Sequence, residues 1–155
     1  MARLEFDLET DLAPERVISA LIDFTERRPE LWPGLRAGDY RVDDIGPTWA
    51  VIREGSGAGI WSRERYDWST PGTVSWTVED SSFAKRGDSL RARVTPRPAG
   101  GGSRVHVSWQ RRGRNLRGHL VAAVIFLTRG YPVKRSLAAG FRAIAAYDER
   151  GTRTT

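Results

Sequence analysis

Alternating apolar and charged residues open the chain and give way to helical spacing. Over residues 3–12, apolar side chains stand at nearly every second position, which predicts a strand with one buried face. Pro14 suits the first turn of a helix, and apolar residues then recur at helical spacing, so a helix is predicted over residues 14–24. A second short helix is predicted over residues 25–31, closed by Pro33-Gly34.

The middle of the chain consists of short alternating runs separated by glycine- and proline-rich turns. This punctuation is typical of an antiparallel meander, in which consecutive strands pair with each other. The predicted strands lie near residues 39–45, 48–54, 60–68, 73–79, 88–95 and 104–111. Together with the first strand they predict a sheet of about seven strands.

A long helix is predicted at the end of the chain, over residues 115–149, because apolar residues there recur at spacings of three and four. Such a helix is about 50 Å long, whereas a compact chain of this length has a radius of gyration of about 15 Å. Gly130 and Pro132 stand at its middle, and proline cannot donate the backbone hydrogen bond that the helix requires. We therefore expect a kink at this point.

This order of elements predicts an α+β fold in which the sheet and the last helix enclose a cavity. A bent antiparallel sheet must cover its concave face, and a helix laid across that face leaves a hollow lined by both. The chain has 155 residues, of which 39% are hydrophobic, enough for one domain. We assign residues 1–149 to that domain and predict a disordered tail over residues 150–155.

The composition excludes several kinds of chemistry. The chain has no cysteine, which removes disulfides, thiol nucleophiles and thiolate metal sites, and we predict neither a metal site nor a cofactor. The N-terminus lacks the apolar core of a secretory signal. The longest apolar run, residues 120–127, is far shorter than the roughly 20 residues that cross a bilayer. These features predict a cytoplasmic protein.

The net charge of +6 comes almost entirely from arginine, since all but two of the 25 basic residues are arginine. Acidic residues are interspersed among them, so no continuous basic stripe forms and no nucleic-acid partner is expected. The densest group is Arg111, Arg112, Arg114 and Arg117, at the start of the long helix. It is either a site for a ligand phosphate, a ligand carboxylate or anionic lipid, or a solvated surface.

Two motifs carry a resemblance to a known family. The segment Ala13-Pro14-Glu15-Arg16-Val17 follows the first strand, and Arg28-Pro29-Glu30-Leu31-Trp32-Pro33-Gly34 closes the second helix. With the order of elements, they resemble the START/Bet v 1-like superfamily, whose bacterial branch is called SRPBCC or polyketide cyclase/dehydrase. The resemblance implies a helix-grip fold with a cavity that in relatives holds lipids, sterols, polyketides or other apolar molecules. It implies no catalytic residue, because the family has no universal catalytic set.

The candidate ligand-binding residues lie on the more apolar face of each predicted strand and along one stripe of the long helix. Aromatic walls with a few polar groups suit flat apolar ligands, although the same rings also fill a solid core. The candidates are Trp49, Arg53, Glu64, Tyr66, Trp68, Trp76, Leu90, Trp109, Leu120, Val124 and Leu127.

Arg53, Glu64 and Tyr66 are polar groups on otherwise apolar faces, where an unpaired charge is costly. They either pair with one another or orient polar groups of a ligand. In an enzyme, Tyr66 is the candidate proton donor and Glu64 the candidate base. The sequence does not set the distance between them, so we assign no catalytic residue.

The predicted function is the binding of a hydrophobic small molecule, a lipid, a polyketide or similar, in an internal cavity, for transport or sequestration. The alternative is a polyketide aromatase/cyclase-type enzyme that acts in the same cavity, and a third class is an interaction module. Residues 120–127 are apolar on all sides of the helix, so part of their surface needs another cover. Either the first-helix pair supplies this cover, notably through Leu31, Trp32 and Leu35, or a homodimer partner or a transient membrane contact does. The sequence leaves monomer and homodimer open.

Overall fold

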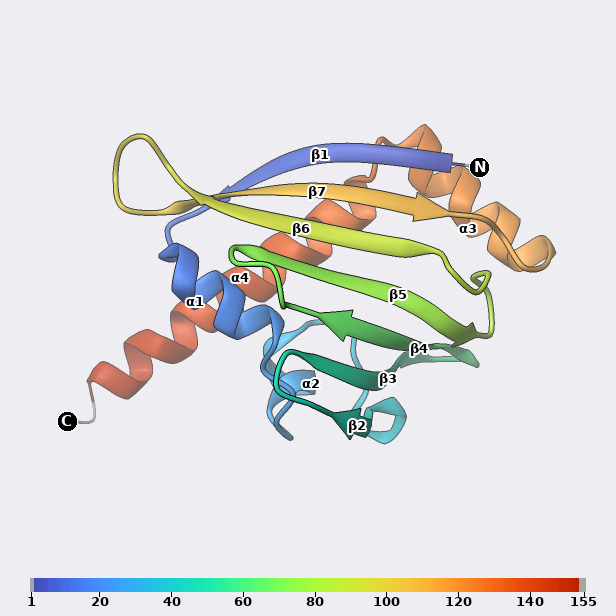
Figure 1. Cartoon of the computed structure of the whole chain (residues 1–155), viewed down its shortest axis with the longest axis horizontal. Coiled ribbons are helices and arrows are strands. Elements are labelled where there is room, and N and C mark those ends of the chain that lie inside the picture. Colours follow the sequence, from blue (N-terminus) through green and yellow to red (C-terminus); the bar gives the residue numbers. More distant parts are fainter. Residues whose placement is uncertain (1, 154–155) are drawn as a thin grey trace.

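The structure is a computed structural model that describes residues 2–153, and it contains one sheet and four α-helices (Figure 1). The strands are β1 (Ala2–Thr10), β2 (Arg41–Ile45), β3 (Trp49–Gly57), β4 (Ile60–Asp67), β5 (Thr73–Ser81), β6 (Ser89–Pro96) and β7 (Ser103–Arg111). The helices are α1 (Pro14–Leu21), α2 (Arg28–Leu31), the short 3-10 helix η1 (Ala37–Asp39), α3 (Leu116–Leu127) and α4 (Tyr131–Thr152). Position 1 of the predicted domain and positions 154–155 of the predicted tail lie outside the described residues.

The sheet is antiparallel and has seven strands in the order β1-β7-β6-β5-β4-β3-β2. Strands β2 to β7 form the predicted meander, and β1 pairs with β7 along its whole length, from Ala2 opposite Arg111 to Thr10 opposite Ser103. The connection from β1 to β2 therefore passes from one edge of the sheet to the other, and it contains α1 and α2 (Figure 1). The predicted α+β helix-grip architecture is confirmed.

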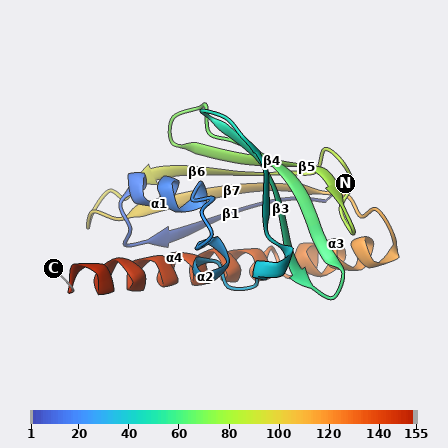
Figure 2. The same ribbon diagram turned by 90° about the horizontal axis from the view of Figure 1, so that it is seen from below.

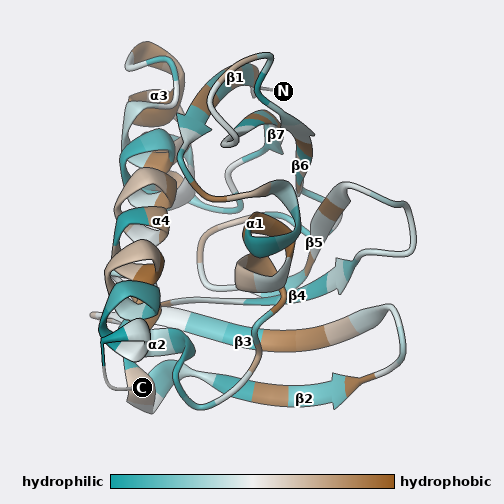
Figure 3. Ribbon diagram, turned by 90° about the vertical axis from the view of Figure 1, so that its left-hand side faces the viewer, coloured by the Kyte–Doolittle hydropathy of each residue, from teal (hydrophilic) through white to brown (hydrophobic). Residues whose placement is uncertain are grey.

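Irregular strand pairing accompanies the bend of the sheet. The register shifts between Val42 and Asp44, between Gly55 and Gly57, and between Arg63 and Glu64. Such bulges increase the local twist of a strand pair. The sheet curves toward α3 and α4, which lie together on one side of the molecule (Figure 3).

The first helix begins at Pro14, as predicted, and ends at Leu21, three residues earlier than expected. Val17, Ala20 and Leu21 are buried and attach it to the core. Arg16 forms two hydrogen bonds with Asp148, of 2.7 and 2.8 Å, which tie α1 to α4. The second helix is a single turn that starts at Arg28, because residues before it form a turn around Asp23 and Thr25 instead.

The long C-terminal helix is interrupted rather than kinked. Helix α3 ends at Leu127, and α4 begins at Tyr131 with Pro132 in its first turn. Arg129 and Gly130 between them have φ angles of 52° and 76°, in the left-handed region that helical residues do not adopt. A Cβ atom at position 130 would lie 2.3 Å from the side chain of Leu4. This close approach and the left-handed φ angle together favour glycine at position 130. The break therefore lies where the kink was predicted.

Helix α4 continues to Thr152, which makes residues 150–152 of the predicted tail helical. In Figure 2, α4 runs along one side of the molecule beside the strands, with α3 beyond its N-terminal end. Within the described residues, no helix is both long and apolar enough to span a bilayer.

Candidate functional site

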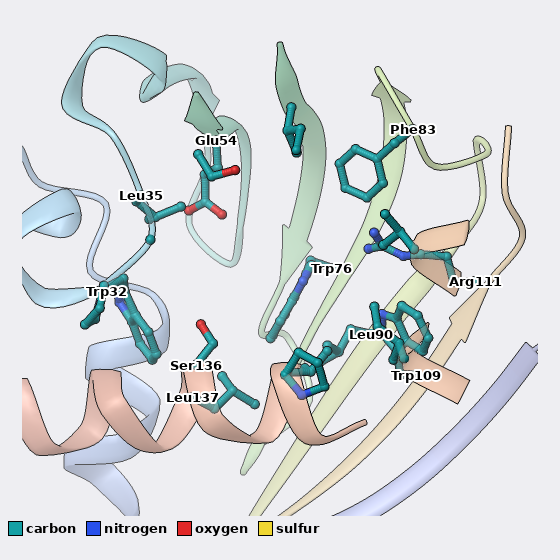
Figure 4. A pocket seen from close by; sticks show the side chains of 18 of the residues that line it. Trp32, Leu35, Glu54, Trp76, Phe83, Leu90, Trp109, Arg111, Ser136 and Leu137 are labelled. Carbon is teal, nitrogen blue, oxygen red and sulfur yellow. The ribbon is translucent and has the colours of Figure 1, made fainter. Parts of the chain in front are cut away.

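A cavity of about 520 Å³ lies between the concave face of the sheet, the segment after α2, and helices α3 and α4 (Figure 4). Its apolar lining includes Leu21, Trp32, Leu35, Trp76, Phe83, Leu90, Trp109, Val121, Ile125 and Leu137. Its charged and polar lining includes Arg28, Glu54, Tyr66, Arg111, Arg117 and Ser136. The site therefore combines a broad apolar wall with a few polar groups, as small-molecule pockets do.

One continuous cross-strand row forms the sheet side of the cavity. Tyr66 pairs with Trp76, Trp76 with Leu90, and Leu90 with Trp109, so the four side chains share one face of the sheet. The rings of Tyr66 and Trp76 stack with centroids 5.2 Å apart. Burial favours this face because the intervening positions on these strands are mostly serine, threonine and arginine.

A hydrogen-bonded network occupies one end of the cavity. The buried Arg28 donates from Nε to Glu54 and from Nη2 to the Tyr66 hydroxyl. Its Nη1 donates to the carbonyl oxygens of Leu21 and Asp23. The Tyr66 hydroxyl donates in turn to Glu54 over 3.0 Å. Burial lowers the pKa of Arg28, but Glu54 and Tyr66 outweigh it and keep the guanidinium charged. Each polar group of this network therefore has a partner.

Tyr66 is held as a neutral phenol in this network. Burial and the adjacent Glu54 carboxylate both raise the pKa of Tyr66 well above its ordinary value. The indole Nε1 of Trp32, on the same side of the cavity, is buried and has no hydrogen-bond partner among the described residues.

Glu64 lies on the same face of β4 as Tyr66 and is buried. It accepts a hydrogen bond of 2.7 Å from Ser62 Oγ. Burial, with a smaller contribution from Glu54, raises the pKa of Glu64 to about 7, against the opposing effects of Ser62, Arg111 and Arg28. The carboxyl group can therefore be neutral or charged near neutral pH, although it does not belong to the cavity lining.

The arginine group at the start of α3 divides between the cavity and the outer surface. Arg112 pairs with Asp88 at 3.1 Å, and Arg114 pairs with Asp80 at 3.2 Å. Arg111 and Arg117 line the cavity instead. The predicted cluster is thus not one anion site, but two of its members face the same hollow.

Most candidate residues in β4 to β7 lie on the cavity wall, but Glu64 of β4 is buried on the inward face outside the cavity lining. Tyr66, Trp76, Leu90 and Trp109 line the cavity. Trp68 faces inward as expected, but it packs against Phe24, with ring centroids 5.9 Å apart, beyond the end of the cavity. The pairing predicted among Arg53, Glu64 and Tyr66 is wrong. Tyr66 bonds to Arg28 and Glu54, whereas Glu64 bonds to Ser62.

The face assigned to β3 is wrong. Ala50 and Ile52 point inward, opposite Tyr66 and Glu64 of β4, whereas Trp49 and Arg53 lie on the other face. There Arg65 covers the ring of Trp49 at 4.3 Å, and Arg53 covers the ring of Trp61 at 4.0 Å. Both faces of β3 carry apolar side chains, so alternation does not distinguish them, and pairing with β4 sets the inward face.

The face assigned to the long helix is also wrong. Leu120, Val124 and Leu127 are exposed, at 60%, 52% and 78%. Val121 and Ile125 line the cavity instead. Because residues 120–127 of α3 are apolar on all sides, this part of the helix has no polar face from which to infer the orientation.

The sequence did not place Arg28, Glu54 or Trp32 in the cavity, and it indicated Arg111 only as part of the arginine group at the start of the long helix. Glu54 shares the inward face of β3 with Ile52, so a correct face for that strand identifies it. Arg111 continues the inward series Val105, Val107 and Trp109 of β7 and was identifiable from alternation. Arg28 begins the single turn α2 and Trp32 follows it, and this segment is too short to show a hydrophobic periodicity.

No model of a protein family and no curated protein sequence matches this chain. Solved structures do match it. The protein TTHA0849 from Thermus thermophilus is 15% identical over 94% of this chain and 99% of its own, with a TM-score of 0.73. A START superfamily protein from Mycobacterium smegmatis is 12% identical over 88% of this chain and 97% of its own, with a TM-score of 0.65.

Norcoclaurine synthase from Thalictrum flavum is 12% identical over 94% of this chain and 85% of its own, with a TM-score of 0.66. It has also been solved in complex with dopamine and hydroxybenzaldehyde. At these identities the similarity concerns the fold. The chain has the START/Bet v 1-like helix-grip fold, with a long helix packed against a bent seven-stranded sheet.

Proposed function

We propose that the protein binds a hydrophobic small molecule in the cavity and transports or sequesters it. The main observation that supports this proposal is the cavity of about 520 Å³. It lies beside the cross-strand row formed by Tyr66, Trp76, Leu90 and Trp109. Protein interiors are close-packed, and ligand pockets typically measure about 300–1,000 Å³, so a hollow of this size favours a guest. The complex of norcoclaurine synthase with dopamine and hydroxybenzaldehyde supports an aromatic ligand for this fold.

The direct test is native mass spectrometry of freshly purified protein, with binding of the neutral fluorescent probe N-phenyl-1-naphthylamine measured in parallel. A carrier retains a co-purified apolar molecule or binds the probe at one site, with a rise in probe emission. A protein that carries no apolar molecule and leaves the probe emission unchanged is not a receptor of this kind.

A matched pair of variants locates the binding site. Val121→Trp places a large ring in the cavity and is expected to weaken probe binding at least tenfold. Val124→Trp makes the same change on the exposed side of the same helix and is expected to bind like the wild type. Circular dichroism and thermal melts check that both variants fold. Equal binding by the folded variants places the probe elsewhere and contradicts the proposal.

An enzyme of the aromatase/cyclase type is the second candidate function. The hydrogen bond from Tyr66 to Glu54 favours it, because it places a coupled hydroxyl and carboxylate on the cavity wall. A carrier releases its ligand unchanged, whereas an enzyme releases an altered product. For an enzyme, Tyr66→Phe is expected to lower the rate while the affinity for the neutral probe stays near that of the wild type.

We propose in addition that the exposed side of α3 touches an anionic membrane when the ligand is exchanged. Leu116, Leu120, Val124 and Leu127 are exposed on this helix, which also forms part of the cavity wall. The sequence contains no aspartate or glutamate between Asp88 and Asp148, so the charge around α3 is complementary to an anionic surface.

Co-sedimentation with phosphatidylglycerol vesicles tests this contact. The wild type is expected to sediment with these vesicles more than with phosphatidylcholine vesicles, and Leu120→Gln with Leu127→Gln is expected to reduce the difference. A protein that ignores both kinds of vesicle but dimerises in sedimentation equilibrium uses this face for a second copy instead.

A further inference from the structure

Arg111 is the last residue of β7, and its side chain enters the cavity at the junction with α3. Its guanidinium lies 4.9 Å from the ring centroids of both Phe83 and Trp109. Figure 4 shows it between these two rings, facing the hollow from the side opposite Glu54. The two aromatic contacts hold a cation in place without supplying a hydrogen-bond acceptor in the plane of the guanidinium.

The Arg111 guanidinium has no polar partner in the described part of the chain. Its Nε is buried without a hydrogen bond, and none of the hydrogen bonds or ion pairs between described residues involves this side chain. Asp88 is occupied by Arg112, whose backbone N–H and Nε both donate to it. Glu64 acts on Arg111 at a distance, but its own hydrogen bond is to Ser62.

An unpaired guanidinium in an apolar wall is energetically unfavourable, and arginine does not lose its proton in proteins. Its planar array of N–H donors matches a carboxylate, which accepts two parallel hydrogen bonds. Arg28, the buried arginine at the other end of the cavity, already donates to Glu54, Tyr66 and two carbonyl groups. The Glu54 carboxylate at that end also repels an anion. An acidic group is therefore favoured at the Arg111 end alone.

We propose that Arg111 binds the acidic group of the ligand, and that the ligand is an apolar molecule with a single carboxylate. Its apolar body lies along Trp109, Leu90 and Trp76, and its carboxylate takes the N–H donors of Arg111. Arg117, which lines the same cavity from the first turn of α3, adds positive charge at this end. The inference rests on the proposed binding function and names the chemical class of ligand for that site.

Competition between matched acids and neutral analogues tests the assignment. Dodecanoate is compared with dodecan-1-ol, and 1-naphthylacetate with 1-naphthylacetamide, as competitors of bound N-phenyl-1-naphthylamine at pH 8. For the wild type, each acid is expected to displace the probe at a concentration at least tenfold lower than its neutral analogue. Arg111→Gln is expected to abolish this preference while the neutral probe still binds. Arg111→Lys keeps the charge without the planar fork and is expected to retain part of the preference.

Arg114→Gln is the matched control, because it removes the same charge from an arginine that is paired with Asp80 on the outer surface. This variant is expected to keep the preference of the wild type. Equal displacement by acids and neutral analogues in the wild type overturns the role of Arg111 and leaves the binding function intact. A preference that survives in Arg111→Gln overturns it as well. A wild type that does not bind the probe contradicts the binding function, and the inference with it.

Discussion

Arg28 of α2 and Glu54 of β3 form a buried ion pair, although they lie 26 residues apart in the sequence. The side chains are only 5% and 16% exposed. The pair joins α2 to β3, and it positions the Tyr66 hydroxyl at the end of the cavity. This contact therefore helps to attach α2 to the sheet and contributes to the polarity of one end of the cavity.

Arg28→Met is expected to destabilise the protein by about 3–5 kcal/mol, because it leaves the Glu54 carboxylate buried without its partner. Urea unfolding followed by tryptophan fluorescence measures the change. Arg27→Met is the matched control, since Arg27 is an exposed neighbour whose ion pair with Asp23 spans 3.4 Å. If the two variants lose similar stability, the buried ion pair of Arg28 with Glu54 contributes no more than the exposed ion pair of Arg27. Adding Glu54→Leu to Arg28→Met is expected to restore part of the loss.

The free energy of unfolding is expected to depend on pH through Glu64. The fold raises the pKa of this carboxyl from 4.5 to about 7 by burial, so the folded state favours its neutral form. Its contribution to stability is complete below pH 4.5 and is lost as the pH rises to about 7. The loss amounts to about 3 kcal/mol.

Glu64→Gln removes this dependence and is expected to be more stable than the wild type at pH 8. The measurement is the difference between the two stability curves from pH 4 to pH 8, since other groups titrate in both proteins. Glu15→Gln, on the exposed first turn of α1, controls for the change in net charge. A flat difference curve for Glu64→Gln shows that folding does not raise the pKa of Glu64.

Gly140 and Gly151 of α4 are expected to respond in opposite ways to alanine. A Cβ atom at Gly140 would lie 2.2 Å from the ring of Trp32, which is buried, so Gly140→Ala is expected to destabilise by about 1–3 kcal/mol. Gly151 has no atom within 4 Å of that position, and Gly151→Ala is expected to stabilise by up to about 1 kcal/mol. Thermal melts compare them, and similar shifts for both variants contradict the close packing of α4 on Trp32.

The two sides of α3 are expected to differ in their sensitivity to truncation. Ile125 is 8% exposed on the cavity side, and Ile125→Ala is expected to destabilise by about 2 kcal/mol or more. Leu120 projects outward on the same helix, and Leu120→Ala is expected to change stability by less than about 0.5 kcal/mol. Urea midpoints of the two variants decide the orientation of the helix, which is reversed if Leu120→Ala is the more damaging change.

Local periodicity accounts for the parts of the fold that were predictable. Strands β4 to β7 have one apolar and one polar face, so their positions and the inward side chains Tyr66, Trp76, Leu90 and Trp109 follow from alternation. The interruption near Gly130 and Pro132 was also evident, because the chemistry of these two residues opposes a continuous helix. The change from a kink to a break depends on the contact of Gly130 with Leu4, which is 126 positions away.

Elements that are apolar on more than one side could be located from the sequence but not oriented. Strand β3 and helix α3 each offer two acceptable apolar faces, and only pairing with β4 and packing against β1 select between them. The candidate site depends on the same long-range contacts. Residue order thus determined the elements and their succession, since periodicity acts over a few residues. Folding in three dimensions determined the cavity, its Arg28–Glu54 end and the unpaired Arg111, because sheet curvature and contacts between distant segments leave no local pattern.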